Sequence, residues 1–388
     1  MLIFFLATFF DEKFVPLRNF KQSMNISDIL TQNLLSKQDL IVLLSLAGKE
    51  QELLFDKAKE IKKKHIGNVV HFRGLVEYTN KCSKNCYYCG IRSENQHIIR
   101  YTVTDKEVLQ AAKIVMENHY GSMVLQSGEC NDNDFILHIT HLIKEIKRVS
   151  NNRIGITLSC GEQREDVYTQ WFEAGAHRYL LRIETSSPEL YAKLHPQNKK
   201  HDYNTRIQCL KNLQKIGYQV GTGVMIGHPF QTVEHLVDDL LFFKENDIDM
   251  IGMGPYLVHK QTPMANYQEN LLAGKQRFSL SLNMIACLRI LMENVNIAAS
   301  TAMQTLNPFG RERAIEVGAN IVMPNLTPLK YRKNYKLYED KPSVNEDAEE
   351  TKNQLEKRIF NINHTIGYDQ WGDSVHFQLR TKNIKPNQ

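Results

Sequence analysis

The sequence predicts an α/β fold, a (β/α)8 barrel of the TIM type with an N-terminal helical extension and a short C-terminal extension. Eight β-rich runs follow Gly67 and alternate with amphipathic, helix-like stretches. Polar or small residues follow all eight runs, at the strand ends where the active sites of such barrels lie. An open doubly wound sheet is the alternative, but no Gly-x-Gly-x-x-Gly turn follows the first run, where a dinucleotide site needs it.

The elements are expected in a simple order along the chain. Ser36 and Asp39 form a capping signal for a first helix, and a second helix covers residues 49–64. The eight strands are expected at residues 69–78, 123–126, 154–158, 178–183, 219–226, 250–257, 296–299 and 320–323. Intervening helices are expected, for example, at residues 105–118, 134–148, 234–245 and 278–293.

The length of 388 residues suits one barrel with appendages. We expect a leader without fixed structure at residues 1–25, helices at 26–66, the barrel at 67–341 and an extension packed on the barrel at 342–388. The apolar start is too short to span a bilayer and has neither a basic flank nor a cleavage site, although Arg18 and Lys21 leave an organelle presequence open. A net charge of +5 indicates neither nucleic acid nor a membrane as a partner.

A loop after the first strand carries Cys82, Cys86 and Cys89, three of the seven cysteines. Three thiolates on one short loop can hold three irons of a cubane cluster and leave the fourth without a protein ligand. The odd number of cysteines and this spacing indicate a reducing compartment. A zinc site completed by His71 or His97 is the alternative, but a structural zinc normally takes four protein ligands, so the count favours iron.

Further candidates lie at the ends of the next strands. Gly128 and Glu129 follow the second strand. Arg182 and Glu184 alternate on the fourth, so both side chains face the barrel interior, where they either pair with each other or hold a zwitterionic ligand. Arg206 lies in a helical stretch, where an exposed arginine is the default interpretation.

The Cys-x3-Cys-x2-Cys spacing, with Tyr88 before the last cysteine, resembles the signature of the radical S-adenosylmethionine (SAM) superfamily. Longer stretches resemble the HydE family within its biotin synthase-like group, over roughly residues 67–341. The stretches that carry this resemblance are residues 72–80, 124–129, 179–185, 251–256 and 319–328, followed by Tyr331, Arg332 and Tyr335.

The resemblance implies one [4Fe-4S] cluster and SAM, which is cleaved reductively to a 5′-deoxyadenosyl radical. It implies a role in building the H-cluster of [FeFe]-hydrogenase, with a small cysteine-bound iron complex carrying carbonyl and cyanide ligands as substrate. The implied partners are an electron donor of the flavodoxin or ferredoxin type and other hydrogenase maturases, but neither nucleic acid nor a membrane. The cytoplasm is the expected location, with the matrix of an anaerobic organelle as the alternative.

Roles carried over by position complete the set of expectations, and no side chain receives a catalytic role. The metal ligands are Cys82, Cys86 and Cys89; the cofactor contacts are Tyr88, Gly128, Glu129, Arg182, Glu184 and Arg206; the substrate contacts are Ser127, Ser300, Thr301, Met323 and Tyr338. Ile183 replaces a histidine of many relatives, and residues 227–232 depart from their Leu-Pro-Gly-Gln-Thr stretch. No cysteine follows Cys287, so no second cluster is expected.

Two other functions remain open from the sequence. One is a different biotin synthase-like enzyme such as methylornithine synthase, which acts on an amino acid. The other is a metal-binding scaffold without catalysis.

Overall fold

The computed structural model describes residues 25–342 and 348–384. The leader expected at residues 1–25 therefore lies, apart from residue 25, outside the described part of the chain. None of the helices described is both long enough and apolar enough to cross a membrane.

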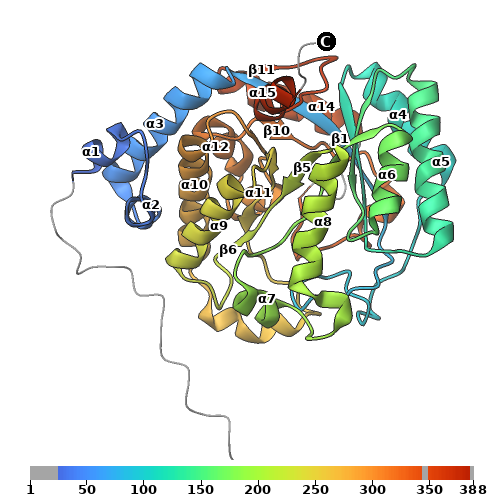
Figure 1. Cartoon of the computed structure of the whole chain (residues 1–388), viewed down its shortest axis with the longest axis horizontal. Helices are drawn as coiled ribbons and strands as arrows, with labels where there is room; N and C mark the ends of the chain where they lie inside the picture. Colours follow the sequence, from blue (N-terminus) through green and yellow to red (C-terminus); the bar gives the residue numbers. More distant parts are fainter. Residues whose placement is uncertain (1–24, 343–347, 385–388) are drawn as a thin grey trace, which may run out of the picture.

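Eight parallel strands form the wall of the barrel, in the sequence order that a barrel requires (Figure 1). They are β1 (Val69–Thr79), β2 (Ser122–Ser127), β3 (Gly155–Ser159), β4 (Ala176–Leu180), β5 (Gln219–Thr222), β7 (Met250–Ile251), β9 (Asn296–Ile297) and β10 (Ile321–Val322). A bridge between Ala298 and Ile321 joins the last two strands, and the Asn320 amide donates to the Ile297 carbonyl at 2.9 Å. Since β10 also pairs with β1, the sheet closes, and the predicted fold class is confirmed.

Two predicted strands are interrupted. The expected runs at 219–226 and 250–257 each break in the middle, and their second halves, β6 (Met225–Ile226) and β8 (Gly254–Pro255), form a separate two-stranded sheet. At the break the chains approach so closely that a side chain on Gly223 would overlap the carbonyl of Gly252. That carbonyl accepts a hydrogen bond from the Arg182 guanidinium instead of continuing the ladder. The break therefore belongs to the barrel mouth.

Helices surround the barrel wall and extend beyond it at both ends of the chain. Before the barrel lie α1 (Ile26–Thr31), α2 (Lys37–Leu44) and α3 (Gly48–His65). Around it lie α4 (Asp105–Glu117), α5 (Asn133–Val149), α6 (Glu165–Glu173), α7 (Pro188–Leu194), η1 (Lys199–His201), α8 (Tyr203–Ile216), α9 (Val233–Glu245), η2 (Pro263–Asn270), α10 (Gly274–Leu291), α11 (Thr301–Leu306), α12 (Gly310–Val317) and α13 (Leu329–Arg332). After it come α14 (Ala348–Asn361), β11 (Thr365–Ile366) and α15 (Val375–Ile384).

Local signals explain where several helices begin. Ser36 and Asp39 form a capping box at the start of α2, as predicted, and Thr104 and Glu107 form one at α4. Helix α10 begins earlier than the predicted residue 278, and ten of its residues are buried because the N-terminal helices cover its outer side. There the side chain of Asn283 donates to the carbonyls of Leu44 and Leu46.

The C-terminal segment closes the amino-terminal end of the barrel. Strand β11 pairs with the start of β1, and the following turn reaches under the strands. There Arg178, which is fully buried, donates to the Trp371 carbonyl at 3.0 Å and to the Asp373 carboxylate at 2.6 Å, while Arg73 and Asn296 both donate to the Gly372 carbonyl. Figure 1 shows β11 and α15 at one end of the molecule and α7 at the other. The carboxyl ends of the strands therefore face away from this closure.

The ion pair between Arg178 and Asp373 gives a test of how the C-terminal segment closes the amino-terminal end of the barrel. Asp373→Ala leaves the guanidinium of Arg178 buried without a carboxylate, so the free energy of unfolding should fall by about 3 kcal/mol, the lower end of the cost of breaking buried pairs. Chemical denaturation at neutral pH measures it. The control is Asp56→Ala, whose side chain is 71% exposed, and for which the change should stay within about 0.5 kcal/mol. Equal effects in both variants would contradict the assigned role of the pair.

Candidate active site

The cysteines lie on a loop at the carboxyl end of β1. The pairing of β1 with β2 slips in register between Glu77 and Thr79, immediately before the loop begins. Arg100 holds the loop together: its guanidinium donates to the carbonyl oxygens of Asn80, Ile91, Arg92 and Asn95 at 2.6, 2.8, 2.6 and 3.1 Å. The beginning and the end of the loop are thus joined through one cation.

The three thiols lie close together on a half-buried loop. Burial raises the pKa of Cys82, Cys86 and Cys89, that of Cys86 to about 12, and the neighbouring cysteines raise those of Cys86 and Cys89 further. Thiolates are stable in such surroundings only beside a strong positive charge, and bound metal ions supply it. The backbone amide of Glu129 approaches the Cys82 sulfur at 3.3 Å, as amides do beside cluster sulfurs.

A single-zinc site finds no matching ligand set. Among the residues that the structure describes, no three His, Cys, Asp or Glu side chains are grouped so that they could hold one metal ion. His71 lies near the amino end of β1, far along the strand from the cysteines, and His97 is exposed. A cubane instead requires each of three thiolates to bind a different iron, which fits a loop with one cysteine at each of three separate positions.

Four buried charged side chains surround the inner side of this loop; we refer to Lys84, Glu129, Glu162 and Arg206 as the charged cluster. Lys84 lies 3.1 Å from Glu129 and 2.7 Å from Glu162, and also contacts the Lys200 carbonyl. Arg206 lies 2.6 Å from Glu162 and 3.6 Å from Glu129. Because the Arg206 side chain is only 11% exposed, its interpretation as an exposed helix arginine is wrong.

Burial and the neighbouring cations shift the pKa of Glu129 in opposite directions. Burial raises the pKa of Glu129 above its ordinary value, while Arg206 and Lys84 favour its charged form. Its Oε2 accepts a hydrogen bond from the Glu162 amide at 2.9 Å. The two cations thus hold two neighbouring carboxylates in place.

Arg182 and Glu184 pair with each other, the first of the two alternatives that the sequence left open. Nε and Nη2 of Arg182 lie 2.8 Å from the two carboxylate oxygens of Glu184. The predicted alternation on one strand is wrong, because β4 ends at Leu180 and Glu184 has a φ of +64°. The pair forms just beyond the strand, where Arg182 also reaches the Gly252 carbonyl.

An aromatic stack flanks the last cysteine. The Tyr88 hydroxyl lies 3.3 Å from Nε2 of His195, and the His195 ring stacks on Tyr191 at 3.9 Å between centroids. His195 donates from Nδ1 to the Tyr191 carbonyl at 2.9 Å, which leaves Nε2 to accept the hydroxyl. Burial lowers the pKa of His195 to about 3, so the ring is neutral.

The predicted substrate contacts line the other half of the mouth, with one exception. Ser300, Thr301, Met323 and Tyr338 follow β9 and β10, whereas Ser127 ends β2 beside the cysteine loop. The Ser300 hydroxyl is buried and finds no hydrogen-bond partner among the described residues, while Thr301 and Tyr338 share a hydrogen bond of 2.8 Å. Met323 lines a cavity of about 40 Å³ in the barrel interior.

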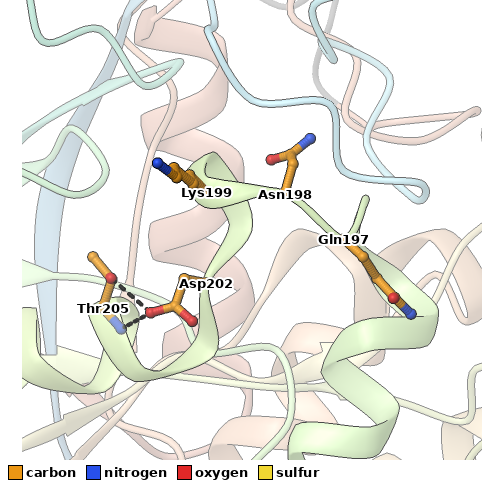
Figure 2. A pocket seen from close by; sticks show the side chains of 5 residues that line it. All are labelled: Gln197, Asn198, Lys199, Asp202 and Thr205. Carbon is orange, nitrogen blue, oxygen red and sulfur yellow. Dashed lines mark hydrogen bonds between the residues drawn. The ribbon is translucent and has the colours of Figure 1, made fainter.

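A larger hollow, of about 500 Å³, opens on the outer surface between α7 and α8 (Figure 2). Its lining consists of Gln197, Asn198, Lys199, Asp202 and Thr205. Asp202 there accepts hydrogen bonds from Thr205 at the start of α8, as an ordinary helix cap does. No predicted site residue lines this hollow, so the mouth of the barrel remains the candidate active site.

Sequence reasoning missed three charged residues of this site. Lys84 stands inside the cysteine motif, and Glu162 follows directly the polar residues at the end of the third strand, so position could have indicated both. Arg100 carries no motif; only the carbonyls that converge on it reveal its role.

Known proteins resemble this chain over most of its length. The model of the radical SAM superfamily matches residues 76–243. The [FeFe] hydrogenase maturase subunit HydE from Thermotoga maritima is 44% identical over 294 residues, which cover 76% of this chain and 80% of that protein. The chain belongs to the HydE family of radical SAM enzymes.

More distant relatives agree with the biotin synthase-like grouping. A biotin synthase from Persephonella marina is 26% identical over 61% of this HydE-family chain and 69% of that protein. A crystal structure of methylornithine synthase covers 89% of the chain and 98% of its own with a TM-score of 0.74 at 23% identity. A crystal structure of the hydrogenase maturase HydG covers 88% of this chain and 75% of its own chain, with a TM-score of 0.71 at 20% identity. These structures show the shared fold.

Ile183 and His228 belong to the expected departures from the HydE-family pattern, and both are buried. Ile183 is fully buried in the main hydrophobic core, and its amide donates to Thr222. His228, in the departing 227–232 segment, is 3% exposed, and neither of its ring nitrogens has a hydrogen-bond partner among the described residues. Burial lowers the pKa of His228 to about 3, so this ring is also neutral.

Lys84 gives a first test of the site. Lys84→Met leaves two buried carboxylates facing one guanidinium, so the free energy of unfolding should fall by about 3 kcal/mol at pH 8. Loss of a cation raises the already elevated pKa of Glu129 further, so the folded variant binds a proton more readily than the unfolded chain. The deficit should therefore shrink as the pH falls toward 5. Urea denaturation between pH 8 and pH 5 measures the difference in free energy of unfolding between variant and wild type. The control is Lys81→Met, at an exposed position. A difference that grows as the pH falls would contradict the charged cluster.

Gly128 gives a second test. An added Cβ would overlap the Lys81 carbonyl and lie 2.8 Å from the Cys82 Cβ, so Gly128→Ala should displace the cysteine loop. We expect reduced iron content after anaerobic reconstitution while the circular dichroism spectrum stays the same. Gly274→Ala is the matched control, because its Cβ meets only Leu306, at 3.5 Å. Full iron content in the Gly128 variant would show that this glycine is not needed by the loop.

Proposed function

We propose that this chain is a maturase of [FeFe]-hydrogenase that cleaves SAM reductively on a [4Fe-4S] cluster held by Cys82, Cys86 and Cys89. The observation that carries the proposal is the loop of three close, half-buried thiols at the mouth of a closed barrel, in a chain 44% identical to a hydrogenase maturase. When bound, the cluster supplies the electron that releases a 5′-deoxyadenosyl radical from SAM.

The residues of the mouth fit this pair of cofactors. Glu129 offers a carboxylate for the ammonium group of SAM, and Arg206 a guanidinium for its carboxylate. In the structure these two side chains lie 3.6 Å apart, and each has a further partner: Lys84 for Glu129 and Glu162 for Arg206. Arg182 and Glu184 form a second pair of opposite charge nearby. Tyr88 adds an aromatic surface beside the cysteine loop.

The opposite half of the mouth supplies the surroundings of the substrate. We propose a small cysteine-bound iron complex with carbonyl and cyanide ligands. The Ser300 hydroxyl has no hydrogen-bond partner within the described part of the chain. It and the hydroxyls of Thr301 and Tyr338 can donate to cyanide nitrogens without competing for the iron as a thiolate would. Met323 and the barrel walls exclude water from the radical.

Methylornithine synthase is the less favoured function. Its solved structure shares the fold at 23% identity, whereas the identity to the hydrogenase maturase is 44%.

The proposed setting is a reducing compartment, the cytoplasm or the matrix of an anaerobic organelle, in line with seven free cysteines. Other hydrogenase maturases are the proposed partners.

Anaerobic reconstitution tests the proposal. The wild-type protein should bind four irons, turn brown and form 5′-deoxyadenosine from SAM with dithionite, and it should consume the cysteine–iron complex. Cys82→Ala should lose 5′-deoxyadenosine formation, because a cubane with two protein ligands is no longer held in place. Cys130→Ser, a cysteine outside the motif whose thiol donates to the Lys81 carbonyl, is the control and should retain it.

Two outcomes would contradict the proposal. Turnover by the Cys82→Ala variant equal to wild type would exclude the cluster assignment. Rearrangement of lysine, with the iron complex left intact, would instead identify an amino acid mutase of the methylornithine type.

A further inference from the structure

The outer side of the cysteine loop forms a basic surface with an apolar centre. Ile99 is 73% exposed there, and its carbonyl accepts from the side chain of Asn80, the residue that begins the loop. The same side chain donates to the Asn334 carbonyl at 2.8 Å. At the other end of the loop, the amide of Gly90 donates to the Leu337 carbonyl at 3.0 Å. The segment that contains Lys333 and Lys336 therefore packs directly on both ends of the loop.

The charges on this surface are predominantly positive. Lys81, Lys333 and Lys336 have no ion-pair partner among the described residues, and Arg100 donates to backbone carbonyls only. Among the nearby acidic side chains, Glu94 pairs with Arg92 and Glu107 pairs with Lys330. Glu339, close to the same His259 ring as Lys336, accepts a hydrogen bond from the Lys260 amide. We call Lys81, Ile99, Arg100, Lys333 and Lys336 the basic face.

Only a thin layer separates the basic face from the thiols. The Arg100 guanidinium donates to the carbonyls of Asn80 and Ile91, which flank the three cysteines on either side. It is close enough to Cys82 and Cys89 for their charges to act on it. An electron that arrives at this face has little protein to cross.

We propose that the basic face is the docking surface for a small acidic protein that carries one electron at a time. This inference rests on the proposed function, since reductive cleavage consumes one electron per SAM. Because the cluster gives up this electron in each turnover, another molecule must restore it. It leaves the reduced carrier, which is oxidised by one electron, and enters the cluster, which is reduced by one.

The chemistry of the face fits such a carrier. An exposed isoleucine surrounded by cations complements a redox centre rimmed by carboxylates, and complementary charge accelerates encounter by about 10- to 1000-fold at low salt. Electron-transfer complexes are small, with less than about 1,200 Å² buried, so a face of this limited extent suffices. The partner is thus selected mainly by charge and approach rate.

The double variant Lys333→Glu/Lys336→Glu tests the proposal, with Lys63→Glu/Lys64→Glu as the matched control. Lys63 and Lys64 are exposed residues at the end of α3, just before the amino end of β1 and therefore at the opposite end of the strand from the cysteine loop, and their exchange changes the charge equally. The probe is an acidic flavodoxin. We expect its dissociation constant at low salt, measured by calorimetry, to rise tenfold or more in the double variant and less than twofold in the control. In the double variant the dissociation constant should also depend less on the salt concentration than in wild type.

Activity provides the second readout. With reduced flavodoxin, 5′-deoxyadenosine formation should fall about tenfold in the double variant, while with dithionite it should stay within twofold of wild type. Equal flavodoxin rates in the double variant and the control would overturn the proposal. An equal loss of activity with dithionite would also overturn it, because the lysines would then act in cluster binding. A change in oligomeric state would overturn it as well, because the face would then be a contact between copies of this chain. If wild type fails with dithionite as well, the proposed function fails instead.

Discussion

The ion pairs between Lys84 and the two glutamates Glu129 and Glu162 are the contact on which the rest of the site depends. Lys84 belongs to the cysteine loop, while the glutamates follow β2 and β3, so one buried ammonium joins the loop to two strands of the barrel. Arg206 from α8 completes the balance of charge. Because each of these charges would be costly to bury alone, the four side chains fix one another and hence the position of the thiols.

A division of labour follows from this arrangement. The first four strands end in the cysteine loop and in the charged or hydroxyl side chains Ser127, Glu129, Glu162 and Arg182, whereas β9 and β10 end in the hydroxyls and the methionine of the opposite half. The C-terminal segment closes the far end of the barrel through Arg178 and Asp373. The mouth therefore lies between two sets of polar side chains, one from each half of the barrel, and above a closed barrel interior. This arrangement limits the access of water to reactive species formed there.

Several predictions from the sequence depend on local patterns, and those were confirmed most fully. The capping box at Ser36 and the helices at 105–118, 134–148 and 234–245 agree with the structure to within one residue at each end. Strand ends were less predictable. The break between β5 and β6 depends on the close approach of Gly223 to Gly252 and on Arg182, which lies just after β4. No property of residues 219–226 alone signals such a contact.

The sequence by itself determined the barrel, the cluster-type cysteines and the family, because periodicity and ligand spacing are short-range properties of the chain. Tertiary structure alone decided which charges meet. It paired Arg182 with Glu184 beyond the strand, buried Arg206 against Glu162 and placed Arg100 among the carbonyls of the cysteine loop. Arg206 and Glu162, for example, lie 44 residues apart in the chain, and the energy of their contact depends on distance and burial, which no linear pattern records.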